Sequence, residues 1–141
     1  MKNLLIKWFT TLNAFLIRIS GGWIGSKLGS QSILLLHHTG RKSGNAYVTP
    51  IAYFDHEGKY LVVASNWGRE KQADWFLNLK AQPRAEIEIH GKRIPTEAHE
   101  AIGSEYERLW KFATEKHPPY RTYQEMTTRR IPIVIFQPVD E

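Results

Sequence analysis

The sequence predicts a mainly β protein with inserted helices (α+β), in which an antiparallel sheet closes into a small barrel. Three observations predict this class. Apolar or alternating runs of strand length recur along the chain, and turns of hairpin length join most of them. Helical patterns interrupt these runs at two places and precede them at a third. With 141 residues, of which 42% are hydrophobic, the chain has enough material for one core.

Residues 4–19 predict an amphipathic helix, because their apolar side chains recur at helical spacing. Lys7 and Arg18 interrupt this run, which therefore falls short of the roughly 20 apolar residues that cross a bilayer. Two placements remain open. The helix either packs on the domain, which we favour, or lies on a membrane surface through residues 2–20.

A glycine-rich break after this helix divides the chain into an N-terminal segment, residues 1–24, and a barrel domain, residues 25–141. We expect the domain to open with a linker over residues 25–32. The first strand is predicted at 33–36. A hairpin follows, with strands at 48–54 and 59–64 around the turn sequence DHEG.

The second half of the chain predicts two inserted helices. Residues 69–81 have a helix-compatible pattern that ends before a proline, and Ser104 with Glu107 predicts a capping box at the start of the next helix. Residues 120–130 are interpreted as a short helix or an ordered loop. Strands are predicted at 85–90, 93–99 and 131–136. Within the second of these, Pro95 suggests an edge or a bulge.

The composition and the absence of certain motifs exclude several classes of function. The chain has no cysteine, which excludes disulfides and thiol nucleophiles, and its six histidines lack the spacing of metal ligands. Neither a GxSxG nucleophile elbow nor a GxxxxGK[ST] phosphate loop occurs. The net charge of +5 favours anionic partners, but the cations are spread along the chain, which argues against nucleic acid. We therefore expect no metal and no nucleic acid, and favour an acidic small molecule or an anionic membrane surface.

Two stretches could together hold one ligand. In the GRKSG turn, two glycines permit close backbone approach, and Arg41 and Lys42 place two cations at one bend. Such a turn suits a phosphate or a carboxylate, although basic surface turns are also common. One hairpin later, the loop at 65–68 carries Trp67. Together, the basic turn and the loop with Trp67 predict a ligand with a charged end and a flat ring.

The ordered set GRKSG, Thr49-Pro50, VVASNWG, Lys71, Trp75 and NLKAQP resembles the deazaflavin (F420)-dependent nitroreductase and quinone reductase family. The resemblance covers about residues 33–138. It implies an antiparallel split β-barrel of the FMN-binding split-barrel type. It also implies an oxidoreductase that binds reduced coenzyme F420 and passes a hydride to an electron-poor acceptor such as a quinone, a nitroaromatic or an enone.

The resemblance also implies the site. The residues expected to bind the cofactor are Thr39, Gly40, Arg41, Lys42, Ser43, Gly44, Thr49, Pro50, Ala64, Ser65, Asn66, Trp67, Gly68, Lys71 and Trp75. For Trp75, a place in the core is the favoured alternative. Tyr120 and Tyr123, which share a face at helical spacing, are expected to be catalytic by orienting the acceptor and supplying a proton. Thr127 and Arg130 are further candidates for the rim.

One departure from the family pattern keeps other functions open. Similar proteins carry an arginine where this chain has Tyr47, so FMN, or a non-catalytic barrel that binds a flavin or another anionic ligand, is an alternative. A third alternative is a peripheral membrane protein that acts through its N-terminal helix. We expect a monomer or a homodimer in the cytoplasm, with attachment to the inner face of the membrane as a further alternative.

Overall fold

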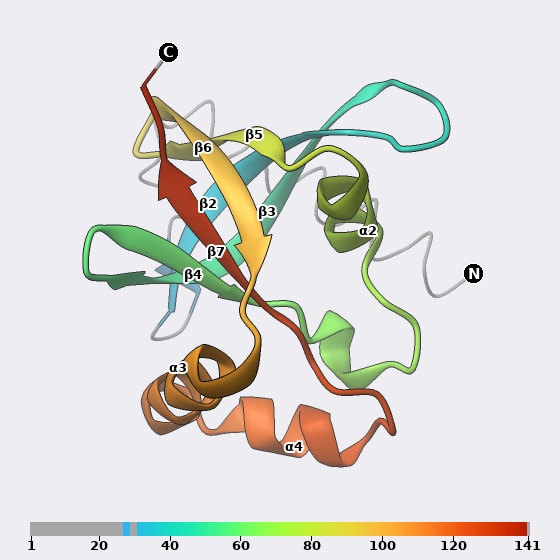
Figure 1. Ribbon diagram of the computed structural model, residues 1–141, viewed down its shortest axis with the longest axis vertical. Helices are drawn as coiled ribbons and strands as arrows, with labels where there is room; N and C mark the ends of the chain where they lie inside the picture. The colour runs from blue at the N-terminus through green and yellow to red at the C-terminus, as the bar shows by residue number, and fades with distance from the viewer. Residues whose placement is uncertain (1–26, 29–30, 141) are drawn as a thin grey trace.

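The computed structural model describes residues 27–28 and 31–140. Within them, three α-helices flank an antiparallel barrel (Figure 1). The predicted N-terminal helix and the predicted domain division at residue 24 lie outside the described residues. In the described part of the chain, no helix has the length and apolar character needed to cross a membrane.

The barrel wall consists of six antiparallel strands, and a seventh short strand extends it. Leu35 of one wall strand pairs with Glu88 of another and so closes the order β2-β3-β4-β7-β6-β5 into a ring. The short strand, β1, pairs with the start of β2. The predicted antiparallel split β-barrel with inserted helices is confirmed. The strands are β1 (Lys27–Leu28), β2 (Gln31–Thr39), β3 (Ala46–His56), β4 (Lys59–Val63), β5 (Arg84–Ile89), β6 (Lys92–Glu100) and β7 (Ile133–Pro138).

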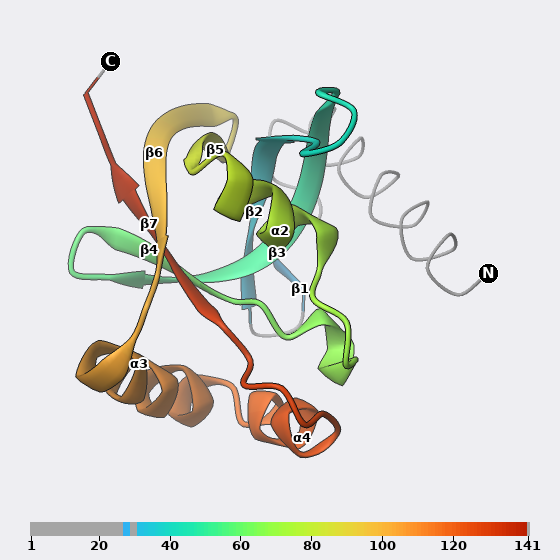
Figure 2. The same cartoon turned by 45° about the vertical axis from the view of Figure 1, so that its right-hand side comes forward.

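The helices occupy two of the connections between strands. A short 3-10 turn, η1 (Asn66–Gly68), and α2 (Asp74–Ala81) connect β4 to β5. α3 (Gly103–Lys116) and α4 (Pro119–Glu125) connect β6 to β7. Figure 2 shows α3 and α4 together below the barrel, whereas α2 lies beside β2 and β3.

The chain buries two layers of apolar side chains, and β4 and β7 contribute to both. Inside the barrel, Val62 and Phe136 pack with Leu34 and with Phe76 of α2. The opposite face of the same two strands packs on α3 and α4 through Leu61, Val63, Ile133 and Ile135. Both faces of β4 and β7 are therefore buried over these residues, which explains why LVV and IVIF are continuous apolar runs rather than alternating ones.

The structure corrects two predictions near element starts. The expected linker at residues 25–32 instead contains β1 and the start of β2, where Ser32 pairs with Lys27 and with Tyr53. The expected capping box is absent from α3. That helix begins at Gly103 after Ile102, with no side-chain cap, because Gly103 adopts the left-handed conformation (φ 59°) and turns the chain into the helix.

Two further predictions are corrected by tertiary contacts. The helix expected over 69–81 begins only at Asp74: Arg69 is extended, residues 70 and 71 form a bend, and Arg129 binds Arg69 and Gln72. Pro95 does not mark an edge, since β6 lies between β5 and β7. Pro95 accepts a hydrogen bond from the Val139 amide but has no N–H to return, and the β6–β7 pairing ends there.

Candidate functional site

The basic turn between β2 and β3 requires glycine at two positions. Gly44 has φ +74°, and its amide donates to the Gly40 carbonyl at 2.9 Å. At Gly40, a Cβ would lie 2.8 Å from the Tyr47 ring and 2.7 Å from Ser43 Oγ. Ser43 Oγ also accepts a hydrogen bond from the Asn45 amide at 3.1 Å, so its hydroxyl shapes the turn. The backbone is thus folded tightly around the two cations.

Arg41 does not extend freely from this turn, because α2 holds it. Its Nη1 donates to Asn78 Oδ1 at 2.8 Å, and its backbone amide donates to the same oxygen at 3.1 Å. Its Nη2 lies 3.4 Å from Asp74 Oδ1, and a quarter of the Arg41 side chain is exposed. Lys42 is exposed. The two cations therefore differ: a carboxylate offsets part of the charge of Arg41, while Lys42 extends from the turn.

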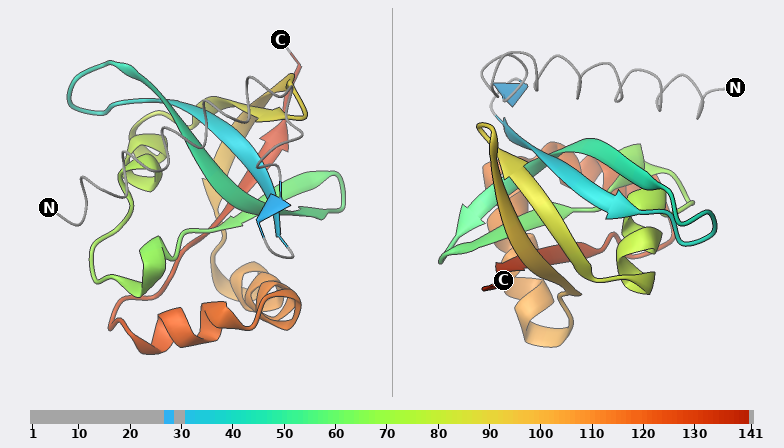
Figure 3. Two further views of the ribbon diagram at one scale, coloured as in Figure 1. Left: turned by 180° about the vertical axis from the view of Figure 1, so that it is seen from behind. Right: turned by 90° about the horizontal axis from the view of Figure 1, so that it is seen from above.

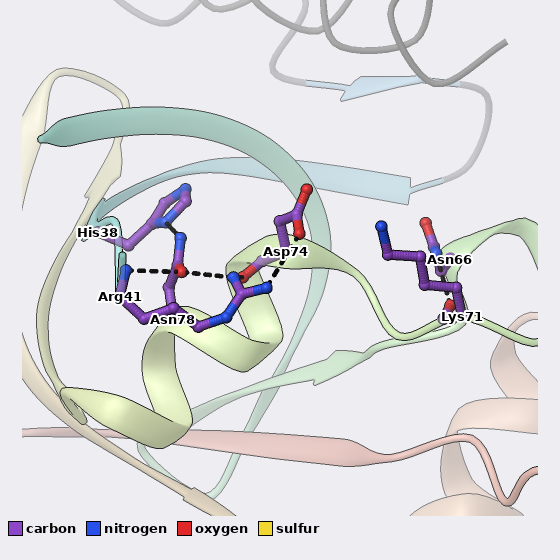
Figure 4. A network of polar contacts seen from close by, with 6 residues as sticks. All are labelled: His38, Arg41, Asn66, Lys71, Asp74 and Asn78. Atoms are coloured by element: carbon purple, nitrogen blue, oxygen red, sulfur yellow. Dashed lines mark hydrogen bonds and ion pairs between the residues drawn. The ribbon is translucent and has the colours of Figure 1, made fainter. Parts of the chain in front are cut away.

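A buried polar chain lies beneath the turn (Figure 4). Because Arg41 occupies the Oδ1 of Asn78, the amide nitrogen of Asn78 faces His38 and donates to its Nδ1 at 3.0 Å. His38 is therefore the Nε2–H tautomer, which donates to Thr49 Oγ1 at 2.9 Å. Burial, followed by the neighbouring His37, lowers the pKa of His38 to about 4, although Asp74 opposes this shift. His38 is thus neutral at pH 7.

Sequence reasoning missed His38 and the role of Asn78. The histidine reads as one of two adjacent histidines on a strand, and its partners lie on β3 and α2. The one available signal was the NLKAQP motif, which contains Asn78. Thr49 is hydrogen-bonded to His38. Pro50, the next residue, points to the opposite face of β3 and pairs with Leu35 on the outside of the barrel. Thr49 and Pro50 therefore cannot both face one ligand.

The second predicted stretch forms a left-handed turn. Asn66, Trp67 and Gly68 have φ values of 48°, 61° and 78°, and the Gly68 amide donates to the Ser65 carbonyl at 3.0 Å. A Cβ at Gly68 would lie 3.1 Å from the Met126 side chain and from the Tyr123 carbonyl, so η1 lies directly against α4. Ala64, just before the turn, is buried.

The turn exposes one aromatic side chain and binds its own loop. Trp67 is 58% exposed, although large apolar side chains are usually covered. Asn66 Nδ2 donates to the Lys71 carbonyl at 2.7 Å, which closes the loop. Figure 4 shows the Lys71 ammonium on the side of the loop that faces Asp74 and Arg41.

The two predicted catalytic tyrosines have different environments. Tyr123 is half-buried, and its ring centroid lies 6.4 Å from that of Trp67, so it borders the aromatic turn. Tyr120 is 5% exposed, and its hydroxyl accepts a hydrogen bond from Gln31 Nε2 at 2.8 Å. Burial raises the pKa of Tyr120. Tyr120 packs in the outer apolar layer, and Tyr123 is the more exposed of the two; the catalytic role of each stays a prediction.

Trp75 is half-buried, packs on the barrel core and meets the Phe76 ring nearly at right angles, with centroids 6.3 Å apart. This position suits the core alternative. A hollow of about 390 Å³ lies elsewhere, between the end of β3 and α3, and includes Asp55, His56 and Phe112. None of its lining residues is a predicted site residue.

The structure brings the two predicted stretches to one side of the barrel. Arg41 contacts Asp74 and Asn78 of α2, and the loop at 65–71 leads into the start of the same helix. Figures 1 and 3 agree that α2 lies beside the β2–β3 turn and that η1 lies between α2 and α4. A cation pair and an aromatic turn therefore flank one helix, as the ends of an elongated acidic cofactor require.

A split barrel with a basic turn and an aromatic loop on one side is typical of proteins that bind flavin-type redox cofactors. Over residues 9–138, the chain matches the family model described as F420H(2)-dependent quinone reductase. The chain belongs to this family. It is therefore an F420H2-dependent oxidoreductase with coenzyme F420 as its cofactor, and the FMN alternative is set aside despite Tyr47.

Individual relatives support the same assignment. An F420H(2)-dependent quinone reductase of Mycobacterium tuberculosis is 35% identical over 131 residues, covering 88% of this chain and 86% of that protein. A solved F420H2-dependent reductase is 40% identical over 74% of this chain and 93% of its own, with a TM-score of 0.67. A solved structure described as a domain-swapped dimer is 35% identical over 92% of this chain and 97% of its own, with a TM-score of 0.71.

Proposed function

We propose that this protein transfers a hydride from reduced F420 to a quinone-type acceptor, with the cofactor bound along α2. The observation that carries the proposal is the arrangement of the turn containing Arg41 and Lys42 and the turn at 65–68 on the same side of the barrel, with α2 between them. The acceptor class follows the description of the family. The nitroaromatic and enone acceptors expected from the sequence remain candidates for direct measurement.

The basic turn fits the acidic end of F420. Lys42 is exposed and supplies an ammonium that any bound phosphate or carboxylate can approach. Arg41 contributes the N–H groups that α2 leaves free and, through Asn78, fixes the shape of the turn. We therefore propose that Lys42 supplies most of the electrostatic attraction, and that Arg41 mainly orients the turn.

The aromatic turn fits the ring end. A reduced deazaflavin supplies the hydride and gathers negative charge on its pyrimidine edge. The amides of Ser65 and Gly68 donate to backbone carbonyls, so we propose that the amides of Asn66 and Trp67 and the Lys71 ammonium are the donors that stabilise such charge. Trp67 and Tyr123 offer ring surfaces for a flat acceptor. The chain contributes mainly position and charge, because the cofactor carries the difficult chemistry.

We propose that Tyr123 donates the proton that the acceptor takes up after hydride transfer. Its ring borders the aromatic turn and it is half-buried, so its hydroxyl can donate to a reduced acceptor. The hydroxyl of Tyr120 accepts a hydrogen bond from Gln31, and this contact connects α4 to the start of β2. We propose Tyr120 as a structural support for the face that carries Tyr123.

Absorbance titration tests the cofactor, and turnover tests the acceptor. We expect saturable binding of F420 and weaker binding of FMN by the full chain. We also expect consumption of F420H2 with a soluble quinone to exceed that with a nitroaromatic or an enone at equal concentration. Saturable binding without turnover across this panel would instead indicate a binding protein.

Association with a membrane surface through residues 2–20 remains a proposal, and it would place the protein near lipid-soluble quinones. We propose the same division as before, an N-terminal segment at 1–24 followed by the barrel domain at 25–141. Flotation with anionic liposomes compares the full chain with a chain that begins at Gly25. Equal flotation of the two would reject the N-terminal segment as the attachment. Size-exclusion chromatography with light scattering of the full chain decides between the monomer and the homodimer.

A further inference from the structure

Arg129 lies in the connection between α4 and β7, and its guanidinium reaches across to the loop that follows β4. Its Nη2 donates to the Ser65 carbonyl at 2.8 Å, and its Nε donates to the Arg69 carbonyl at 2.8 Å. Its Nη1 donates to Gln72 Oε1 at 2.9 Å. Each of the three guanidinium nitrogens therefore binds a different residue of one loop, about 60 positions away in sequence.

The two carbonyl groups that Arg129 binds lie on either side of the left-handed turn. Between Ser65 and Arg69, three consecutive residues have positive φ, and the middle one is Trp67. A tryptophan rarely adopts this conformation, because its Cβ crowds the neighbouring backbone. Such strain persists only where the surroundings hold it in place. The guanidinium joins both ends of the turn and supplies that restraint.

Neighbouring contacts make Arg129 a fixed anchor rather than a mobile one. The amide and the hydroxyl of Thr128 donate to the two carboxylate oxygens of Glu70, at 2.6 and 2.8 Å. On the other side, Gln124 donates to the Arg129 carbonyl at 2.7 Å and accepts from the Ile131 amide at 2.9 Å. The connection is thus attached to α4 as well as to the loop.

We propose that Arg129 is a positioning residue for the redox site: it holds the turn at 65–69 in its left-handed form, so that Trp67 and the turn's amides face the cofactor ring. It acts through the Ser65 and Arg69 carbonyl groups and not through its charge. The link to F420 rests on the proposed function, whereas the link to the turn does not.

The test compares Arg129→Lys and Arg129→Met with Arg108→Met in the full chain. Lysine keeps the charge but cannot bridge two carbonyl groups and Gln72 at once. Arg108 is a matched control, because it is an exposed arginine on α3 and belongs to neither proposed part of the site. Thermal unfolding of each variant shows whether the fold is retained.

Hydrogen exchange without cofactor is the first measurement. The amides of Gly68 and Arg69 donate within the turn, to Ser65 and Asn66. We expect both to exchange at least tenfold faster in the two Arg129 variants and at the wild-type rate in Arg108→Met. Unchanged exchange at these amides, or acceleration spread evenly over the barrel, would overturn the proposal.

F420 titration is the second measurement. We expect Arg129→Lys to raise the Kd for F420 about tenfold despite its retained charge, and Arg108→Met to leave it within twofold. Wild-type affinity in Arg129→Lys, with a loosened turn, would overturn the positioning role. If the wild-type protein itself binds no F420, the proposed function fails and the link to the cofactor fails with it, while the exchange measurement still decides whether Arg129 holds the turn.

Discussion

Lys42 and Arg41 are adjacent in one turn, yet they differ in how much of their charge is offset and in how accessible they are. Asp74 lies 3.4 Å from the Arg41 guanidinium and offsets part of its charge, while Lys42 extends from the turn without burial. The free-energy cost of binding an anion is small for an exposed ammonium, because few of its existing contacts must be broken. Most of the affinity for an acidic cofactor tail should therefore depend on Lys42.

Replacing Lys42→Ala should raise the Kd for F420 about tenfold, which corresponds to about 1.4 kcal/mol. Lys111→Ala on α3 removes another exposed cation far from the turn and is the matched control. Fluorescence titration at low and moderate salt measures both. An equal loss in the two variants would show that only net charge matters, and the turn would not be the anion site.

His38 makes the stability of the turn depend on pH. Its pKa is about 4 in the folded chain and 6.5 as a free side chain. Between these values the unfolded chain binds a proton that the folded chain does not, so the free energy of unfolding falls as pH drops. The loss is about 2 kcal/mol by pH 5. Above pH 6.5 both states are neutral, and the effect disappears.

Urea unfolding at pH 7.5 and pH 5 measures this loss. The variant His38→Gln keeps a polar side chain in the buried position but has no imidazole to titrate. It should therefore lose about 2 kcal/mol less than the wild type between the two pH values. The same loss in both proteins would mean that other groups account for the pH dependence.

At the scale of elements, η1 and α4 behave as one unit. Gly68 lies against Met126 and the Tyr123 carbonyl, and Arg129 binds the loop from the connection after α4. The aromatic turn is thus positioned by a helix that follows it by more than 50 residues. Trp67 and Tyr123 come together for this reason and not through any local pattern.

Gly68→Ala should damage this unit, and Gly58→Ala is its control, because both glycines have φ +78° and only Gly68 has neighbours within 4 Å of a new Cβ. Each variant should lose about 1 kcal/mol of stability from backbone strain. Gly68→Ala should lose more, because backbone at 3.1 Å cannot give way, and its rate of F420H2 oxidation should fall at least tenfold. Gly58→Ala should keep the wild-type rate. Similar rates in the two variants would contradict the model of a shared unit.

At the scale of the whole molecule, β4 and β7 join the two apolar layers. Ile135 and Phe136 are neighbours on β7, and they face the outer layer and the barrel interior respectively. Neither layer can unfold without exposing one face of these strands. Helices α3 and α4 and the barrel should therefore unfold together.

Ile135→Ala and Phe136→Ala should each cost about 3 kcal/mol and should leave a single transition. Circular dichroism and tryptophan fluorescence, followed in the same thermal scan, measure its cooperativity. Gln137→Ala, the next position along β7, is exposed and should change stability by less than about 0.5 kcal/mol. Separate transitions for Ile135→Ala would show that the helices form an independent layer.

Much of the fold could be predicted from the sequence, because strand alternation and turn chemistry are local. The hairpin around DHEG and the strand at 85–90 match β3, β4 and β5 to within two residues at each end. The start of α2 was predicted five residues early, and β2 was predicted too short at both ends. In each case, pairing or side-chain contacts from distant segments set the boundary.

The sequence by itself determined the strand runs, the glycine-bounded cationic turn and the resemblance to the family, because these depend on residue types at short spacing. Only the tertiary structure decided that Arg41 lies on Asn78 while Lys42 extends outward, that Tyr123 meets Trp67 while Tyr120 is buried, and that Arg129 binds the Ser65 and Arg69 carbonyl groups. The physical reason is separation along the chain: the partners of Arg41 and Arg129 lie 33 to 64 residues away, and closing the barrel is what brings them together.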